Sequence, residues 1–256
     1  MNNPAKDFGQ IASEYAFFEE HSTEAQADIR AYREHIATIK PSAGTVNMLD
    51  FGCGSGTFTM RFLQHAGWSS EHLHLTLVEP AESQRRKAVT RLSPLVESLT
   101  ASASLPSALD HSFDLVLANH VFYYVPDVRD TLSRLISALT PGGVLLLAIA
   151  SRTNLLVDLS IACFRLLGRE IPYKSSEDVE PALQALSVDY AKQQIPYEVS
   201  FSDTEENRAR ILRFLLADHL TPSSSATLLD WFDRYSHDGR IEIRTETDHY
   251  TLRGSD

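Results

Sequence analysis

Cysteine is scarce in this chain of 256 residues: Cys53 and Cys163 are the only two. They show no metal-ligand spacing and are too few for a disulfide framework, which favours a reducing, cytoplasmic setting. No run of eighteen apolar residues and no charged-then-apolar leader occurs, so we expect a soluble protein with no membrane partner. Internal repeats and low-complexity segments are also absent, and the length suits one globular α/β domain with additions.

Positive charge is in short supply as well. The chain has 23 lysines and arginines against 34 aspartates and glutamates, a formal net charge of -11. This balance argues against a nucleic-acid substrate, because phosphate binding requires a basic surface. It is compatible with a small cationic substrate, although acidic surfaces also serve solubility alone.

The most informative stretch is a glycine-rich turn at residues 52–56, between an apolar strand predicted at 46–51 and a helix predicted at 57–66. Glycine lets the backbone turn sharply and approach a ligand closely, and free N–H groups at the helix start face that ligand. The G-x-G-x-G spacing, with Asp50 two residues upstream, differs from the dinucleotide pattern G-x-G-x-x-G. It resembles motif I of the class I S-adenosylmethionine-dependent methyltransferases.

The following strand agrees with this resemblance. Residues 73–78 are mostly apolar and end in Glu79, where the family has an acid that binds both ribose hydroxyls. A carboxylate suits that task because it accepts two hydrogen bonds from a vicinal diol. The alternative interpretation is an NAD enzyme with a degenerate glycine loop.

The remaining chain alternates strands and helices and predicts an α/β fold with a doubly wound, Rossmann-like mixed sheet. Further parallel strands are expected at 96–101, 115–119 and 144–150, and further strands at 194–201 and 240–253, the last lying antiparallel at the C-terminus. The apolar alternation of that last strand slips near Asp248, which suggests a bulge. Helices are expected within 8–40, where Phe8 opens an apolar face, and from a start within 79–84 to about 92. Further helices are expected at 127–139, 155–167, 175–186, 205–217 and 224–235.

Three segments follow from this pattern. Residues 1–40 are expected to form N-terminal helices of a substrate cap, 41–150 the Rossmann-like cofactor core, and 151–256 further cap helices with the final strands. We therefore expect a helical cap over the substrate side of the sheet.

A more specific resemblance lies upstream of the core, in the string His21-Ser22-Thr23-Glu24. It resembles the N-terminal substrate-binding segment of histamine N-methyltransferase, which carries the same four residues at this distance from motif I. Further agreement lies in the segments 78–84, 123–125 and 173–178, so the resemblance spans essentially the whole chain. From the residues alone, Thr23 and Glu24 equally suit the start of a helix, with Thr23 as N-cap.

This resemblance implies a cofactor site. Carried over residue by residue, S-adenosylmethionine would be held by Asp50, Gly52, Gly54, Gly56, Glu79, Gln84, Ser102, Ser104 and Asn119. The two serines belong to a small-residue loop that suits either an adenine contact or a plain connector. No metal is expected.

The resemblance also implies substrate-binding residues. They are Tyr15, Phe18, Glu24, His120, Tyr123, Tyr124 and Glu246. Glu24 matches the family's substrate-binding glutamate, and His120 stands where the family has a glutamine that contacts imidazole. Near Glu246 the family has an asparagine, and between Ser151 and Gly168 this chain lacks the family's tryptophan. These departures favour a substrate other than histamine on the same scaffold.

The expected reaction is N-methylation of a small imidazole or other heteroaromatic amine. Glu24 would anchor its cationic or N–H end, and His120 would hydrogen-bond the acceptor group and relay its proton. Phe122 and the aromatic residues named above would line the pocket, and aromatic faces attract cations. These aromatics and His120 also suit core positions, and we expect one of Tyr123 and Tyr124 to face the pocket and the other to pack.

Three rivals remain at this stage. One is an O- or carboxylate-methyltransferase of secondary metabolism, and another is a non-catalytic protein that binds S-adenosylmethionine. An RNA or protein methyltransferase is disfavoured by the acidic charge and the expected cap. The protein is expected to act as a monomer, with a dimer as the alternative.

Overall fold

The computed structural model describes residues 11–39, 44–106, 109, 111–220 and 228–254, and these form two compact units. The sheet unit takes the described residues within 28–149, 174–194 and 248–254, and the helical unit takes those within 11–27, 150–173 and 195–247. Phe8 and the start of the helix expected at 224–235 lie outside the described residues. Within the described part of the chain, no helix is long and apolar enough to cross a bilayer.

The sheet unit is built on five parallel strands. They are β1 (Val46–Phe51), β2 (Leu73–Val78), β3 (Ser98–Ser102), β4 (Phe113–Asn119) and β5 (Leu139–Ile149). The strand order is β3-β2-β1-β4-β5-β8-β6, and residues 248–253 of β8 (Arg240–Arg253) pair antiparallel with β5. The mixed, mostly parallel sheet expected from the sequence is confirmed.

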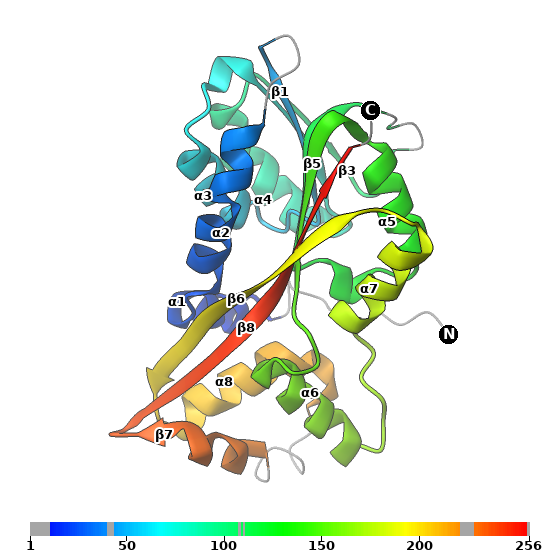
Figure 1. The fold of residues 1–256 in the computed structure, drawn as a ribbon. Coiled ribbons are helices and arrows are strands. Elements are labelled where there is room, and N and C mark those ends of the chain that lie inside the picture. Colours follow the sequence, from blue (N-terminus) through cyan, green and yellow to red (C-terminus); the bar gives the residue numbers. More distant parts are fainter. Residues whose placement is uncertain (1–10, 40–43, 107–108, 110, 221–227, 255–256) are drawn as a thin grey trace. The chain divides into compact units, whose positions relative to one another are not determined.

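Helices cover both faces of this sheet (Figure 1). On one face lie α2 (Glu24–Thr38), α3 (Thr57–Ala66) and α4 (Glu82–Leu92), and on the other lie α5 (Val128–Ser137) and α7 (Ser176–Ala185). Adjacent strand residues alternate between the two cores: Met48 packs under α3 and Leu49 under α5. Burying each such side chain contributes about 1.5–3 kcal/mol, which is why these strands are apolar throughout.

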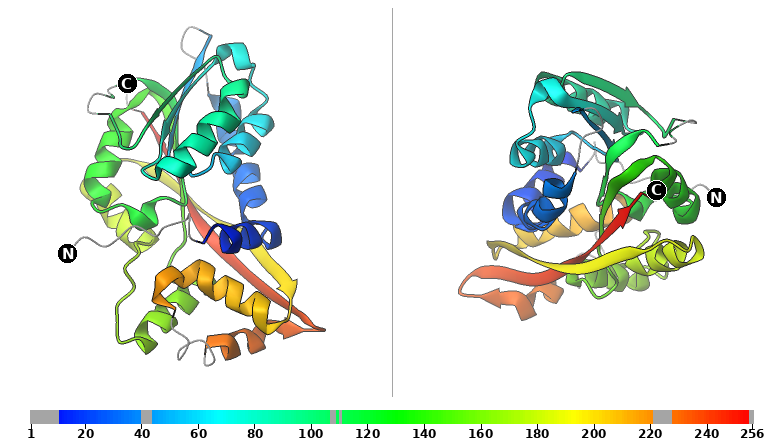
Figure 2. Two further views of the ribbon diagram at one scale, coloured as in Figure 1. Left: turned by 180° about the vertical axis from the view of Figure 1, so that it is seen from behind. Right: turned by 45° about the horizontal axis from the view of Figure 1, so that its top comes forward.

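The helical unit has its own apolar core. Its helices are α1 (Ala12–His21), α6 (Leu155–Leu166) and α8 (Glu205–Leu216). The strand β6 (Tyr190–Ser202) lies beside β8 (Figure 2). A short strand, β7 (Ser236–His237), also pairs with β8. Short 3-10 helices occur at Ser70–His72, Ser93–Leu95, Phe122–Tyr124, Ala217–His219 and Asp230–Tyr235.

Most predicted boundaries agree with the structure to within a few residues. Ser98–Ser102 forms β3, so Ser102 ends a strand and does not lie in the loop predicted for it. The described end of the predicted helix 224–235 is a 3-10 helix. The pairing of β5 with β8 runs without a shift from Asp248 to Arg253. The slip in alternation near Asp248 falls where β8 passes from the helical unit to the sheet unit.

Candidate active site

The glycine-rich turn follows β1 at the carboxyl edge of the parallel strands. Gly52, Gly54 and Gly56 have positive φ angles of +82°, +53° and +74°, which residues other than glycine rarely adopt. A Cβ atom on Gly52 would lie 2.2 Å from Cγ2 of Val121, whereas one on Gly54 would meet no atom within 4 Å. The turn is therefore closely packed on its Gly52 side and open at Gly54, where a ligand can approach the backbone.

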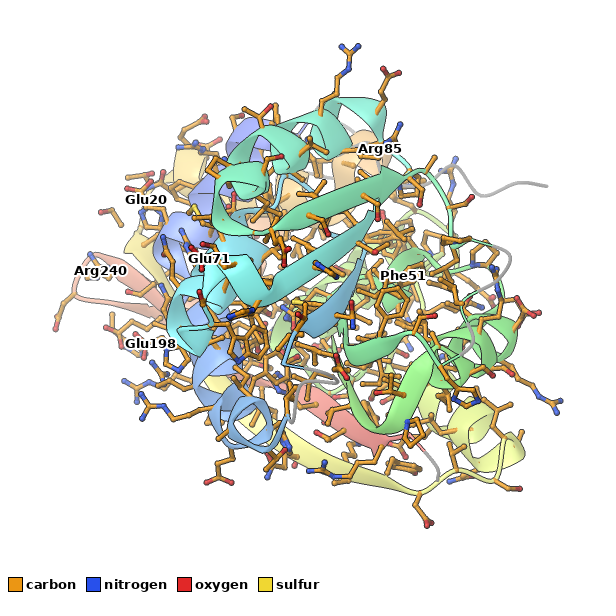
Figure 3. All side chains as sticks on the ribbon, turned by 90° about the horizontal axis from the view of Figure 1, so that it is seen from above. Glu20, Phe51, Glu71, Arg85, Glu198 and Arg240 are labelled. Atoms are coloured by element: carbon orange, nitrogen blue, oxygen red, sulfur yellow. The ribbon has the colours of Figure 1, made fainter. Side chains whose placement is uncertain are left out.

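Glu79 is fixed beside this turn at the end of β2. Its carboxylate accepts hydrogen bonds from the Gly54 N–H at 3.0 Å and from the Ala81 N–H at 2.8 Å. The Arg85 guanidinium donates to the Glu79 carbonyl oxygen at 2.5 Å, which anchors the start of α4. Figure 3 labels Arg85. A carboxylate has about four acceptor sites, so two remain for a diol. The resemblance assigned Glu79 this role, and the geometry is compatible with it.

Asp50 lies in β1, two residues before Gly52, and is buried. It accepts a hydrogen bond from the Thr59 hydroxyl, which ties β1 to the first turn of α3. Burial raises the pKa of Asp50 to about 7, with the Glu79 charge adding to the rise and the Thr59 hydrogen bond opposing it. Asp50 thereby joins the strand before the turn to the helix after it.

This raised pKa predicts a pH-dependent stability. The folded-state pKa of Asp50 lies above its unfolded value of 3.8, so the folded protein binds the proton more tightly than the unfolded chain. The resulting contribution to the free energy of unfolding is complete below pH 3.8 and is lost as the pH rises toward 7. Asp50→Asn should therefore flatten the pH dependence of unfolding between about pH 4 and pH 7. Three pKa units correspond to roughly 4 kcal/mol. Urea denaturation at several pH values measures this, and parallel curves for both proteins would contradict it.

The other predicted cofactor residues surround the same strand ends. Gln84 is buried in the first turns of α4, and Ser102 ends β3 with its hydroxyl donating to the Ser104 carbonyl oxygen at 2.7 Å. Ser104 is exposed. Each of these residues stands in the sheet unit, within the loops and helix starts that follow β2 and β3.

The end of β4 carries a hydrogen-bonded cluster centred on Asp28 of α2. Asp28 Oδ2 lies 3.1 Å from His120 Nε2 and 3.2 Å from Asn119 Nδ2, and Oδ1 lies 2.8 Å from His249 Nε2. The Tyr32 hydroxyl donates to Asn119 Oδ1 at 2.7 Å. Asn119, expected to contact the cofactor, is thus also held by side chains of α2.

Asp28 is buried as a charged group. Its side chain is 1% exposed, and burial alone would raise its pKa, but the charge and hydrogen bonds of His120 and His249 outweigh burial and hold that pKa well below its usual range. Across the described residues, no group of three or more His, Cys, Asp or Glu is arranged to hold a metal ion.

The sequence interpretation did not single out Asp28. The signal was present, because Asp28 precedes Tyr32 by four residues and so lies on the same apolar stripe of α2 as Tyr32 and Ile36. A charged residue at a buried position is rarely found without a partner. His249, in β8, had no such local signal.

His120 adopts a strained backbone. Its φ angle is +54°, uncommon for a residue with a side chain, and its N–H donates to the Ala148 carbonyl oxygen at 2.9 Å. Such strain often marks a functional position. Its ring lies parallel to that of Tyr123, with centroids 6.2 Å apart, and its Nδ1 lies 3.3 Å from the Tyr123 hydroxyl.

The neighbouring aromatics differ in burial. Phe122 is fully buried and packs edge-on against Phe51 at 6.1 Å, so it belongs to the core of the sheet unit. Tyr123 and Tyr124 are both half-buried and their rings meet at 6.0 Å. Tyr123 also contacts His120 through its hydroxyl and its ring.

The other predicted substrate residues lie in the helical unit. Phe18 is buried and stacks on Phe214 at 4.5 Å, while Tyr15 is 37% exposed and lies 5.9 Å from the same ring. Glu24 is half-buried at the first position of α2, and its N–H donates to the Ser22 hydroxyl at 3.1 Å. Glu246 is half-buried in β8, where its carbonyl oxygen accepts from Asn154 at 2.8 Å.

Thr23 stands at the N-cap position of α2, where its carbonyl oxygen accepts from the Ala27 N–H at 2.9 Å. Its hydroxyl accepts from the Glu198 N–H of β6 at 2.9 Å, next to a bridge between Ser22 and Val199. The His-Ser-Thr-Glu string is therefore joined to β6 within the helical unit, which fixes the backbone at Glu24.

Comparisons with known sequences agree with this geometry. A family model described as a methyltransferase domain matches residues 49–145, from the glycine turn to β5. An uncharacterized methyltransferase of Mycobacterium tuberculosis is 33% identical over 106 residues, covering 40% of this chain and 49% of that protein. A trans-aconitate 2-methyltransferase of Rhodopseudomonas palustris is 32% identical over 136 residues, covering 52% and 47%.

Histamine N-methyltransferase A of Xenopus laevis is a further relative, 26% identical over 164 residues, covering 57% of this chain and 56% of that protein. The chain thus spans about half the length of the curated relatives it matches. The resemblance to the histamine enzymes is therefore distant.

Solved structures define the class of fold. The YcgJ protein of Bacillus subtilis superposes with a TM-score of 0.58 at 15% identity, covering 89% of this chain and 99% of that one. A possible histamine N-methyltransferase of Thermotoga maritima gives 0.55 at 16% identity, covering 97% and 98%. The fold is that of the class I S-adenosylmethionine-dependent methyltransferases. Within it, residues 49–145 correspond to the methyltransferase domain of the family model.

Proposed function

We propose that this protein is an S-adenosylmethionine-dependent methyltransferase that N-methylates a small nitrogenous metabolite, an imidazole or another heteroaromatic amine. The observation that carries the methyltransferase assignment is the glycine turn held by Glu79 at the carboxyl edge of the sheet. The match of residues 49–145 to a methyltransferase domain supports it. The nitrogenous substrate rests on the histamine N-methyltransferase resemblance and on the net charge of -11.

The residues of the turn fit S-adenosylmethionine. The open space at Gly54 admits a ligand to the backbone, and the Glu79 carboxylate retains acceptor capacity for the ribose diol. Gln84, Asn119 and the serines after β3 supply polar groups for the rest of the molecule. When bound, S-adenosylmethionine supplies an electrophilic methyl group on a sulfonium.

Two residues would act on the acceptor. We propose that Glu24 binds its cationic or N–H end by charge and hydrogen bonding, as the family's glutamate does. His120 would hydrogen-bond the acceptor group, in the position of the family's glutamine. Because the methyl group comes from the sulfonium, the chain needs no nucleophile of its own, and its task is to align the acceptor and exclude water.

A turnover assay with a substrate panel tests this proposal. Purified protein with S-adenosylmethionine should form S-adenosylhomocysteine with histamine or related heteroaromatic amines, read by mass spectrometry. Glu24→Gln should raise KM for a cationic amine at least about 10-fold, the size of one charge-assisted hydrogen bond. Glu20→Gln, an exposed change on α1, is the matched control and should leave KM unchanged. Equal KM values in both variants would contradict the role of Glu24.

A carboxylate acceptor is the second candidate, favoured by the relative of Rhodopseudomonas palustris, a trans-aconitate 2-methyltransferase. A carboxylate would be repelled by Glu24, so Glu24→Gln should then leave its binding unchanged or improve it. Turnover of trans-aconitate with no turnover of any amine would decide for this candidate.

A further inference from the structure

We propose that Asp28 is a positioning residue that holds His120 as a proton acceptor, so the methyl acceptor carries a removable proton on nitrogen or oxygen. This inference rests on the proposed function and narrows its substrate class. It excludes acceptors such as an ionised carboxylate, which have no proton to lose.

The first step of the argument is the geometry of the Asp28–His120 pair. The carboxylate is 1% exposed and the imidazole 21% exposed, with Oδ2 and Nε2 separated by 3.1 Å. Asp28 is thus buried, whereas His120 is partly exposed to solvent. A carboxylate is an acceptor only, so Nε2 carries a hydrogen, and in the neutral imidazole Nδ1 then carries the lone pair.

The second step is what faces Nδ1. The Tyr123 hydroxyl lies 3.3 Å away, and the two rings are parallel. Tyr123 is half-buried and follows the strained turn at His120. A proton can therefore arrive at Nδ1 through the Tyr123 hydroxyl.

The third step is the fixed orientation of Asp28. Its second oxygen is held by His249, which is 4% exposed and stacks on Tyr32 at 4.7 Å. Asn119 donates to the same oxygen as His120, at 3.2 Å. Groups from α2, β4 and β8 thus prevent the carboxylate from turning away, as a positioning residue requires.

The proposed step is a proton transfer. The N–H or O–H bond of the acceptor breaks and its proton passes to the Tyr123 hydroxyl, while that hydroxyl gives its own proton to Nδ1 of His120. The electron pair stays on the acceptor atom, where it can bond the methyl group. The imidazole becomes an imidazolium beside the Asp28 carboxylate, which stabilises the new charge. The proton then leaves to water, and His120 returns to its neutral form.

Asp28→Asn tests the inference through two readouts. The first is the tautomer of His120, measured by ¹⁵N NMR of the free protein. We expect the Nε2–H form in the wild type, and we expect the variant to lose that preference. The second is turnover: kcat on an amine should fall about 100-fold, the scale of proton-transfer catalysis, with KM and S-adenosylmethionine affinity within threefold. His74→Gln, on β2, contacts Asn47 and Glu97 and should match the wild type in both.

The outcomes separate the two proposals. A wild-type tautomer and kcat in Asp28→Asn would overturn the role of Asp28, as would turnover restricted to carboxylates. Failure to bind S-adenosylmethionine would refute the proposed function. The NMR result would still test whether Asp28 fixes the tautomer of His120. If Asp28→Asn does not fold, His120→Gln, which retains a donor toward Asp28, should show the same loss of kcat, and an unchanged kcat would overturn the proposal.

Discussion

Glu79→Ala should lower the affinity for S-adenosylmethionine at least about 100-fold, equivalent to about 2.7 kcal/mol. The carboxylate holds the N–H groups of Gly54 and Ala81 and is proposed to bind the ribose diol, so its removal loses both the shape of the turn and the ligand contacts. Hydrogen bonds to a charged group contribute about 1.5–3 kcal/mol each. Isothermal titration calorimetry measures the change.

Two further variants serve as controls for the affinity measured with Glu79→Ala. Glu82→Gln removes an exposed carboxylate on α4 that pairs with Arg86 and should leave the affinity unchanged. Glu79→Gln keeps one acceptor oxygen and should fall between the wild type and Glu79→Ala. An affinity within threefold of the wild type in Glu79→Ala would refute the cofactor role of Glu79.

Gly52→Ala should destabilise the fold by about 2–5 kcal/mol. The new Cβ would lie 2.2 Å from Val121 Cγ2 and 2.5 Å from its Cβ, and the backbone would keep a φ angle of +82°. The left-handed conformation costs about 1–2 kcal/mol and overpacking about 1–3 kcal/mol. A fall of about 10 °C in Tm follows, measurable by scanning calorimetry.

Gly54→Ala is the matched control, because its φ angle is also positive but its Cβ would meet no atom within 4 Å. It should cost only the conformational part, about 1–2 kcal/mol. Gly52→Ala combined with Val121→Gly should recover the steric part of the loss. Equal melting temperatures for Gly52→Ala and Gly54→Ala would show that Val121 does not limit the turn.

The cofactor half of the candidate site was predictable because its signals are local. Strand, turn and helix follow one another over residues 46–66, and the acid at the end of the next strand is found by counting along the chain. Apolar runs of strand length predicted β1 and β2 to the residue. Less apolar segments were placed less well: β3, largely exposed, begins two residues later than predicted.

The substrate half was predictable only where a resemblance existed. Glu24 and Tyr123 were identified from matching strings, and His120 from its position, where the family has a glutamine; their roles stay proposals. Their partners carried no such string. Nothing in the spacing of α2 and β8 indicates that Asp28 and His249 meet, because the residues lie 221 positions apart.

The sequence by itself determined the alternation of strands and helices, the glycine turn and Glu79, since each depends on neighbours within a few residues. Only the tertiary structure decided that Asp28 joins His120, Asn119 and His249, and that β8 changes its apolar phase where it passes between units. The physical reason is that a buried charge is tolerated only with partners, and those partners come from whichever strand ends the sheet order brings together.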